Sequence, residues 1–266
     1  MRATSATVDP QEVERFAAHA DAWWDPQGSF RPLHRLNPVR LDYIRQHLTA
    51  HFGRSISSLR PFEGLTLLDI GCGGGLVAEP MSRLGFAVTA VDADDQAIAV
   101  AGAHAEATGL SIDYRIATPE WIAGESIAGE WIAGKWIAGE SMAGTGQRFD
   151  VVLALEIIEH VANPAVFLGS IGALVRQRGA FIGATLNRTP RSFAAAIIGA
   201  EYMLGWLPRG THDWRKFMRP SELVLGLRRN GLNPTEMTGV TYDLIRGEWS
   251  LSRDLEVNYM VTAVRG

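Results

Sequence analysis

The sequence of 266 residues predicts an α/β fold built around a mostly parallel sheet. From Leu65 onward, short apolar runs alternate with longer amphipathic stretches, which is typical of consecutive β-α-β units. The first run ends in a glycine-rich turn, as strands of open parallel sheets do where they meet a ligand. Hydrophobic residues make up 47% of the chain and charged residues 20%, an ordinary globular composition. We therefore expect one large core with additions.

The first 60 residues predict a helical cap ahead of this core, which is expected to span residues 61–266. We expect a helix near Gln11–Trp24, a loop through Asp25–Pro38 and a second helix from about Val39 to His51. Trp23 and Trp24 are adjacent, so on a helix they point to different faces. Such residues are expected to pack the cap onto the core rather than to bind a ligand.

Five apolar runs predict the parallel strands: Leu65–Ile70, Phe86–Val91, Ile112–Ile116, Val151–Leu155 and Ala180–Leu186. The helices between them are expected to end at glycines: Leu76–Leu84 before Gly85, Asp95–Thr108 before Gly109, and Pro164–Val175 before Gly179. A helix over Ser221–Arg229 follows, and then two strand-like runs, Met237–Tyr242 and Val257–Val264. A chain that ends on a helix and two strands is predicted to add an antiparallel edge to the parallel sheet.

Two segments interrupt the pattern. Residues 117–148 are expected to form a loop that carries five imperfect copies of the unit WIAGE at 121–144. A period of five matches neither a strand nor a helix, so we expect a surface loop without a part in the activity. The alternative is that its tryptophans and isoleucines form a sticky patch or a lipid contact. Residues 187–219 hold an apolar stretch, 192–208, with basic flanks. This second segment could be a lid over the site or could lie in a membrane surface, and it is too short and polar to span a bilayer.

Charge and cysteine content narrow the class of partner. The formal net charge of -4 provides no field for a polyanion, so nucleic acid is not expected as a partner. Cys72 is the only cysteine, which excludes an intrachain disulfide. The N-terminus lacks the basic-then-apolar order of a signal peptide, and no run of about 18 apolar residues occurs. We expect a cytoplasmic protein that could contact the inner face of the cell membrane peripherally.

The turn after the first strand contains four glycines in five residues, Gly71-Cys72-Gly73-Gly74-Gly75, preceded by Asp69. Asp92 closes the next strand, 21 residues after Gly71, where a carboxylate could accept both hydroxyl protons of a ribose. A dinucleotide-binding loop would require a third glycine at position 76, which is Leu76. A plain tight turn would not need four glycines. The segment instead resembles the first motif of class I S-adenosylmethionine (SAM)-dependent methyltransferases.

The fourth strand leads directly into Glu156-Ile157-Ile158-Glu159-His160. If this turn is helical, Glu156, Glu159 and His160 share a face at the same edge of the sheet as the glycine loop. Three interpretations compete here. The side chains could serve only the helix start and the packing, they could bind a divalent cation through hard oxygen ligands, or His160 could transfer a proton directly. A cation would acidify and orient a phenol, most naturally one of two neighbouring hydroxyls.

Several phrases, spread from about residue 12 to residue 261, resemble the ubiquinone-biosynthesis O-methyltransferase family. They are Phe30–Arg40 (FRPLHRLNPVR), GCGGG, EIIEHV, Thr185–Arg188 (TLNR), Gly199–Tyr202 (GAEY), Pro208–Asp213 (PRGTHD) and Val257–Met260 (VNYM). The resemblance implies the class I methyltransferase fold: a Rossmann-like, mostly parallel seven-stranded sheet with helices on both faces and an insertion after the fifth strand.

The same resemblance implies an enzyme that methylates ring hydroxyls of polyprenyl catechol and demethylubiquinol intermediates. It implies SAM contacts from Arg40, Gly71, Asp92 and Leu155, to which the loop residues Asp69 and Gly73 are added. It also implies a divalent cation, typically Mg²⁺, at the catalytic residues Glu156, Glu159 and His160. A ubiquinone-biosynthesis complex is an expected partner. His34 and His212 are further candidates for proton removal, although each lies in a predicted loop, where a surface or structural role is the alternative.

Two other hypotheses remain open. The chain could methylate another small phenol, an amine or a carbon acid, although cation binding has little use in methylating an amine. It could also be a catalytically silent scaffold subunit with a SAM-binding fold. A methyl-transfer assay with a polyprenyl catechol separates the three.

Overall fold

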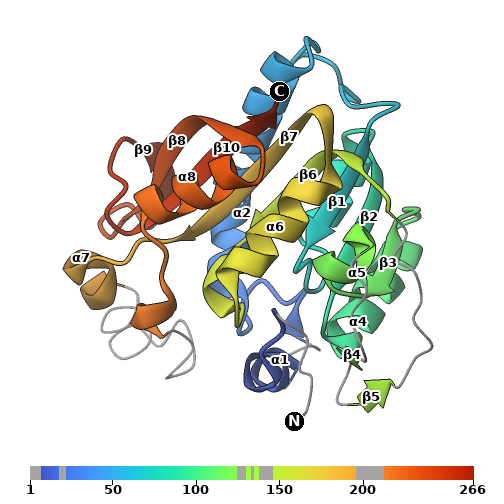
Figure 1. Cartoon of the computed structure of the whole chain (residues 1–266), viewed down its shortest axis with the longest axis horizontal. Helices are drawn as coiled ribbons and strands as arrows, with labels where there is room; N and C mark the ends of the chain where they lie inside the picture. The colour runs from blue at the N-terminus through green and yellow to red at the C-terminus, as the bar shows by residue number, and fades with distance from the viewer. Residues whose placement is uncertain (1–6, 18–21, 125–129, 133–134, 138–145, 196–212) are drawn as a thin grey trace.

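The computed structural model describes residues 7–17, 22–124, 130–132, 135–137, 146–195 and 213–266. Within them, eight strands form one sheet (Figure 1). In spatial order these are β3 (Asp113–Ile116), β2 (Ala87–Asp92), β1 (Thr66–Ile70), β6 (Phe149–Leu155), β7 (Val175–Leu186), β10 (Asn258–Arg265), β8 (Leu232–Asp243) and β9 (Glu248–Ser252). Two further short strands, β4 (Glu130–Ile132) and β5 (Lys135–Ile137), pair with each other apart from this sheet.

The sheet is mostly parallel, as the sequence predicts. The pairs β2–β3, β1–β2, β1–β6 and β6–β7 are parallel, whereas β10 pairs antiparallel with both β7 and β8. Because β10 is antiparallel to both of its neighbours, β8 runs in the same direction as β7 and the other parallel strands. The antiparallel strand is therefore inserted between two parallel strands, and an eighth strand, β9, pairs with β8 at the outer edge. Seven strands were expected, and the additional one is β9, whose short sequence EWSLS is only partly buried.

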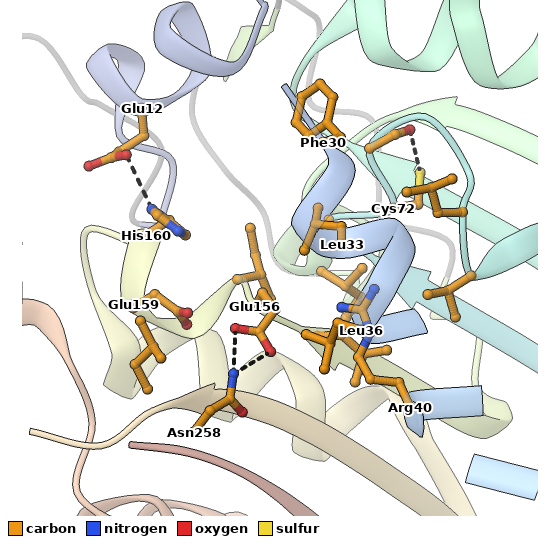
Figure 2. Close-up of a pocket in the computed structure, with 18 of the residues that line it drawn as sticks. Glu12, Phe30, Leu33, Leu36, Arg40, Cys72, Glu156, Glu159, His160 and Asn258 are labelled. Atoms are coloured by element: carbon orange, nitrogen blue, oxygen red, sulfur yellow. Dashed lines mark hydrogen bonds and ion pairs between the residues drawn. The ribbon is translucent and has the colours of Figure 1, made fainter. Parts of the chain in front are cut away.

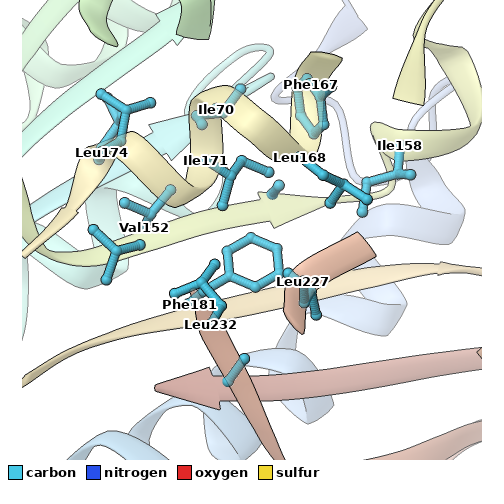
Figure 3. Packing of buried hydrophobic residues seen from close by; sticks show 14 of the residues in the cluster. Ile70, Val152, Ile158, Phe167, Leu168, Ile171, Leu174, Phe181, Leu227 and Leu232 are labelled. Atoms are coloured by element: carbon cyan, nitrogen blue, oxygen red, sulfur yellow. The ribbon is translucent and has the colours of Figure 1, made fainter. Parts of the chain in front are cut away.

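Three helices cover one face of the sheet. They are α5 (Pro119–Ala123), α6 (Pro164–Leu174) and α8 (Pro220–Arg229), and α6 contacts both of the others. Figure 3 shows the apolar layer beneath them, where Phe167 and Ile171 of α6 and Leu227 of α8 meet Phe181 of β7. Burying a side chain of this size contributes about 1.5–3 kcal/mol, so this layer fixes the strands that carry the site.

The opposite face is covered by α2 (Arg31–His51) and α3 (Ala78–Arg83), with Ile98 of α4 (Asp95–Ala107) packed beside them. Ile44 and Leu48 of α2 are fully buried against the sheet. The Tyr43 hydroxyl lies 2.9 Å from the Thr262 Oγ1 of β10, so the helix is tied to the centre of the sheet. The boundary between a cap of residues 1–60 and the core stays a prediction.

The expected loop through Pro38 was wrong in its second half, because α2 begins at Arg31 and contains Pro38. Pro32 stands at the start of the helix, where a missing backbone N–H leaves no hydrogen bond unmade. Immediately before Pro38, the buried Leu36 and the hydrogen bond from Asn37 Nδ2 to the Leu76 carbonyl (2.7 Å) hold the helix against the core. Tertiary packing thus outweighs the helix-breaking tendency of a proline.

Two further expectations need correction. The first helix, α1 (Pro10–Ala17), does not extend to Trp24, since Trp23 and Trp24 lie in a turn that leads toward α2. Gly179 does not follow a helix end, because α6 stops at Leu174 and β7 begins with the next residue. A Cβ on Gly179 would lie 2.8 Å from the Asp150 carbonyl oxygen, so that glycine serves close strand approach.

The repeat is not wholly a surface loop. Its first copy belongs to α5, where Thr118 caps the helix start, Gly124 ends it in the left-handed region and Ile122 is fully buried. A deletion that begins at Trp121 would therefore remove a core residue. Most of the remaining copies, and residues 196–212 of the second insertion, lie outside the described residues. The described ends of that insertion contain α7 (Pro190–Ser192) and the 3₁₀ helix η4 (Trp214–Lys216), tied by a 2.8 Å hydrogen bond from Trp214 Nε1 to the Thr189 carbonyl.

No helix in the part of the chain that the structure describes is long and apolar enough to cross a membrane.

Candidate active site

A cavity of about 810 Å³ runs along the carboxyl ends of the parallel strands. Its walls come from the sheet edge, from the N-terminal residues Thr7–Val13 and from the start of α2. The cavity is lined by all nine residues that the sequence nominates: Arg40, Asp69, Gly71, Gly73, Asp92, Leu155, Glu156, Glu159 and His160. Their assigned roles stay predictions, but the fold brings them to one space.

The glycine loop and Asp92 are joined directly. The Asp92 carboxylate accepts hydrogen bonds from the Gly73 N–H (2.8 Å, Oδ2) and the Asp94 N–H (3.0 Å, Oδ1). Burial raises the pKa of Asp92, and these backbone donors oppose that rise. The carboxylate thus holds the loop in shape and lies at the end of β2, where the sequence predicts the ribose contact.

Trp23 and Trp24 pack the N-terminal segment onto this loop. Trp23 stacks on Phe30 with ring centroids 3.7 Å apart, and Trp24 stacks on His104 at 3.5 Å. The Trp24 Nε1 donates to the Gly74 carbonyl at 2.9 Å. The expected packing role agrees with this geometry, although Trp23 also lines the cavity.

Arg40 and Asp69 form the buried charged floor of the cavity. Arg40 is 4% exposed and donates to Asn37 Oδ1 at 3.1 Å. Burial lowers its pKa, while the negative charges of Glu156 and Asp69 raise it. Burial raises the pKa of Asp69 to about 7, with Arg40 opposing the rise and Asp92 adding to it. One guanidinium among three carboxyl groups suits a ligand that carries both a positive centre and a carboxylate.

The acidic residues after β6 do not share a helical face, so that expectation was wrong. Glu156 has φ of 56°, in the left-handed region, and only Ile158–His160 form a 3₁₀ helix, η2. Each side chain meets a different partner, and Figure 2 shows those of Glu156 and His160. The Glu156 oxygens accept from Asn258 Nδ2 at 3.2 and 3.3 Å, Glu159 Oε2 accepts from Thr185 Oγ1 at 2.7 Å, and His160 Nδ1 lies 3.2 Å from Glu12 Oε2.

Glu159 is held in an environment that disfavours its charge. Its side chain is buried, and this burial together with the charge of Glu156 raises its pKa to about 8. The two carboxyl groups are therefore near enough to repel each other at neutral pH. Among the described residues, no three His, Cys, Asp or Glu side chains are grouped so as to hold a metal ion.

Sequence reasoning missed residues that long-range contacts bring to the cavity. Glu12 of α1 lines the cavity and contacts His160, and Lys216 Nζ, outside the lining, reaches both Asp9 Oδ2 (3.0 Å) and Glu12 Oε1 (3.3 Å). Partners separated by more than a hundred positions leave no local signal. His34 does not line the cavity, since its Nε2 lies 2.8 Å from the Trp23 carbonyl, and His212 lies outside the described residues.

The family model of a methyltransferase domain matches residues 39–237. The ubiquinone biosynthesis O-methyltransferase of Paramagnetospirillum magneticum is 50% identical over 260 residues, which cover 98% of this chain and 96% of that protein. The protein of the same name from Parvibaculum lavamentivorans is 49% identical over 264 residues, covering 99% and 96%.

Solved structures agree on the fold. The magnesium protoporphyrin IX methyltransferase of Synechocystis PCC 6803 with bound SAH has a TM-score of 0.63 at 16% identity, covering 96% of this chain and 100% of that one. A SAM-dependent methyltransferase from Aquifex aeolicus has a TM-score of 0.53 at 14% identity, covering 94% and 98%. The matching domain model and the fold show that the chain is a SAM-dependent methyltransferase. Its identity of about 50% to the named relatives over nearly the whole chain shows that it belongs to the ubiquinone biosynthesis O-methyltransferase family.

Proposed function

We propose that this enzyme transfers the methyl group of SAM to a ring hydroxyl of polyprenyl catechol and demethylubiquinol intermediates of ubiquinone biosynthesis. The observation that carries the proposal is the continuity of one cavity from the glycine loop and Asp92, past Glu156, to the strands β7, β10 and β8. The first part suits the cofactor and the second suits an acceptor. The two parts meet at Arg40 and Glu156.

At the cofactor end, each residue has a task that its position supports. When SAM is bound, Asp92 would accept hydrogen bonds from the ribose hydroxyls, Arg40 would pair with the carboxylate of the cofactor, and Asp69 would favour the sulfonium charge. The acceptor oxygen would form its bond to the methyl carbon as the carbon–sulfur bond breaks, and the hydroxyl proton would pass to the cluster of Glu156, Glu159 and His160. Holding the two reactants in line supplies much of the rate.

A divalent cation, preferably Mg²⁺, is proposed at Glu156, Glu159 and His160, which would have to turn toward a common point to bind it because the described structure does not group them as ligands. Two neighbouring carboxyl groups fit such an ion, because its charge would offset both the burial of Glu159 and the repulsion from Glu156, which together raise the pKa of Glu159. The fit of His160 is less direct, since its Nδ1 faces Glu12. Metal-bound histidines commonly hold a carboxylate through their other ring nitrogen, as this pair would. When bound, the ion lowers the pKa of a coordinated hydroxyl.

Chelation tests this cation site. Methyl transfer by the purified protein should fall to background in EDTA and recover with excess Mg²⁺, because the attacking oxygen would lose its main source of acidification. Glu159→Ala should lose the Mg²⁺ response and still bind SAM with the affinity of the unchanged protein, as measured by calorimetry. Full activity in EDTA would contradict the cation proposal and would leave the methyltransferase assignment intact.

The outer part of the cavity supports an acceptor with an apolar tail. Beyond Asn258, its lining is mostly apolar and includes Leu186, Ala194, Ala195, Val240, Leu244, Trp249 and Val257. This arm ends at the turn between β8 and β9, where Leu244 is 75% exposed and Ile245 is 98% exposed. An isoprenoid chain leaving the ring would run along this wall, so tail and ring would both be bound.

We propose that residues 187–219 contact a membrane surface peripherally and that the substrate arrives by this route. The same surface is the proposed place for contact with a biosynthetic complex. The exposed Phe193 of this segment supports the contact, and so do the exposed Leu244 and Ile245 of the β8–β9 turn at the end of the same cavity arm. The basic flanks support it less, because Arg191 pairs with Asp254 and Glu256, and Arg188 pairs with Glu222. We therefore expect the protein to float with neutral as well as anionic liposomes, and Ile245→Ser to reduce both. No flotation with either composition would contradict the membrane contact.

A direct assay tests the proposed reaction. The purified protein, SAM and a catechol with a short isoprenoid tail should yield the mono-O-methylated ring and S-adenosylhomocysteine in equal amounts by mass spectrometry. Methylation of amines but not of the catechol or a demethylubiquinol would instead indicate another acceptor class. Binding of SAM with no transfer to any acceptor would indicate a scaffold subunit.

A further inference from the structure

Asn258 has one amide atom that nothing in the described structure satisfies. It is the first residue of β10, is 5% exposed and lines the cavity. Its Nδ2 donates to both carboxylate oxygens of Glu156, at 3.2 and 3.3 Å, and Figure 2 shows the two side chains facing each other. Its Oδ1 is buried and has no hydrogen-bond partner among the described residues.

The orientation of this amide is fixed by Glu156. Turning the carboxamide over would place Oδ1 against a carboxylate, replacing two hydrogen bonds with repulsion. A buried acceptor without a donor costs about 1–3 kcal/mol, which a ligand can recover by bringing an N–H or O–H. Asn258 Oδ1 is thus oriented to accept a hydrogen bond from a ligand that carries an N–H or O–H donor.

The donor belongs to the acceptor substrate rather than to the cofactor. Asn258 pairs across the sheet with Leu186 of β7 and Val240 of β8, and both of these residues line the outer arm of the cavity. The cofactor end is formed by other strands, β1 and β2. A phenolic O–H is the donor that a ring substrate offers here.

Building on the proposed O-methylation, we propose that Asn258 selects ortho-diphenols. Its Oδ1 accepts a hydrogen bond from the hydroxyl that is not methylated, while its Nδ2 holds the Glu156 carboxylate beside the hydroxyl that is. The two ends of one carboxamide lie next to each other, as do two ortho hydroxyls. This role explains why the phrase VNYM forms part of the site, although the residues follow Glu156 by about a hundred positions.

The test compares kcat/KM for a catechol and for the same ring without the second hydroxyl. The unchanged protein should prefer the catechol by roughly 10–100-fold, the range expected when a buried polar group is left unpaired. In Asn258→Ala this preference should collapse to within about threefold, whereas calorimetry should find SAM affinity preserved. Asn258→Ala also removes the contact that positions Glu156, which should lower kcat for both rings. The ratio of the two kcat/KM values is therefore the quantity that tests the proposal.

Asn187→Ala is the matched control. Asn187 is another buried amide at this edge of the sheet, but its Nδ2 donates to the Leu255 carbonyl at 2.8 Å and it does not line the cavity. This variant should lose thermal stability and keep the catechol preference. An unchanged preference in Asn258→Ala overturns the proposal. If that variant does not fold, equal kcat/KM values for the two rings in the unchanged protein overturn it. No methylation of either ring by the unchanged protein would count instead against the proposed reaction.

Discussion

Replacing Asp92 with alanine is expected to raise the Kd for SAM by about 100–1,000-fold. A hydrogen bond to a charged group contributes about 1.5–3 kcal/mol, and the substitution removes acceptors for both ribose hydroxyls. The substitution also destabilises the glycine loop, because the Asp92 carboxylate accepts hydrogen bonds from the Gly73 N–H at 2.8 Å and the Asp94 N–H at 3.0 Å. Isothermal titration calorimetry measures the change directly, without any acceptor present.

Asp95→Ala is the control for this variant. Asp95 lies three positions further on, at the start of α4, is exposed, and carries the same charge. Its loss should leave the Kd within about twofold, since an exposed charge contributes little. If Asp92→Ala bound SAM as tightly as the unchanged protein, the ribose would not lie at the end of β2 and the cofactor end of the cavity would have to be reassigned.

The cofactor end could be predicted from sequence because its signals are local. A buried strand, four glycines in five residues and an acidic residue at the next strand end follow one another within the 28 positions of Leu65–Asp92. Parallel strands that carry such turns meet at one sheet edge, so the approximate position of Asp92 follows from the pattern alone. The helices and strands of the core were predicted for the same reason, with errors mostly of a few residues at their ends.

The acceptor end could not be predicted in this way. Glu156 adopts a left-handed conformation, which no propensity assigns to a glutamate, and its partner Asn258 arrives from the last strand. Glu12 reaches His160 from the opposite end of the chain. The burial of Ile122 is equally hidden, because its copy of the repeat has nearly the same letters as the others and only its position after β3 sets it apart. Contacts of this kind depend on the folded topology.

Gly73→Ala is expected to disrupt both the fold of the N-terminal segment and SAM binding. Gly73 has φ of +51°, a conformation that costs an alanine roughly 1–2 kcal/mol. A Cβ at this position would lie 2.3 Å from Cη2 and 2.4 Å from Cζ2 of Trp23. The indole cannot move away without breaking its stack on Phe30. We expect a total loss of about 2–4 kcal/mol, a fall in Tm of roughly 5–15 °C, and at least about tenfold weaker SAM binding.

Gly102→Ala is the matched control, because Gly102 lies within α4 and a Cβ there would meet nothing within 4 Å. Alanine at that site should stabilise the protein by about 0.5–1 kcal/mol.

A double variant identifies the cause of the loss in Gly73→Ala. If the indole is what the new methyl group meets, adding Trp23→Ala should cost much less in the Gly73→Ala background than in the unchanged protein, since the contact is already broken. Strictly additive losses in Tm would mean that the strained backbone alone is responsible. Trp23 would then merely neighbour the loop, and the N-terminal segment would close the cavity without bearing on the conformation that binds the cofactor.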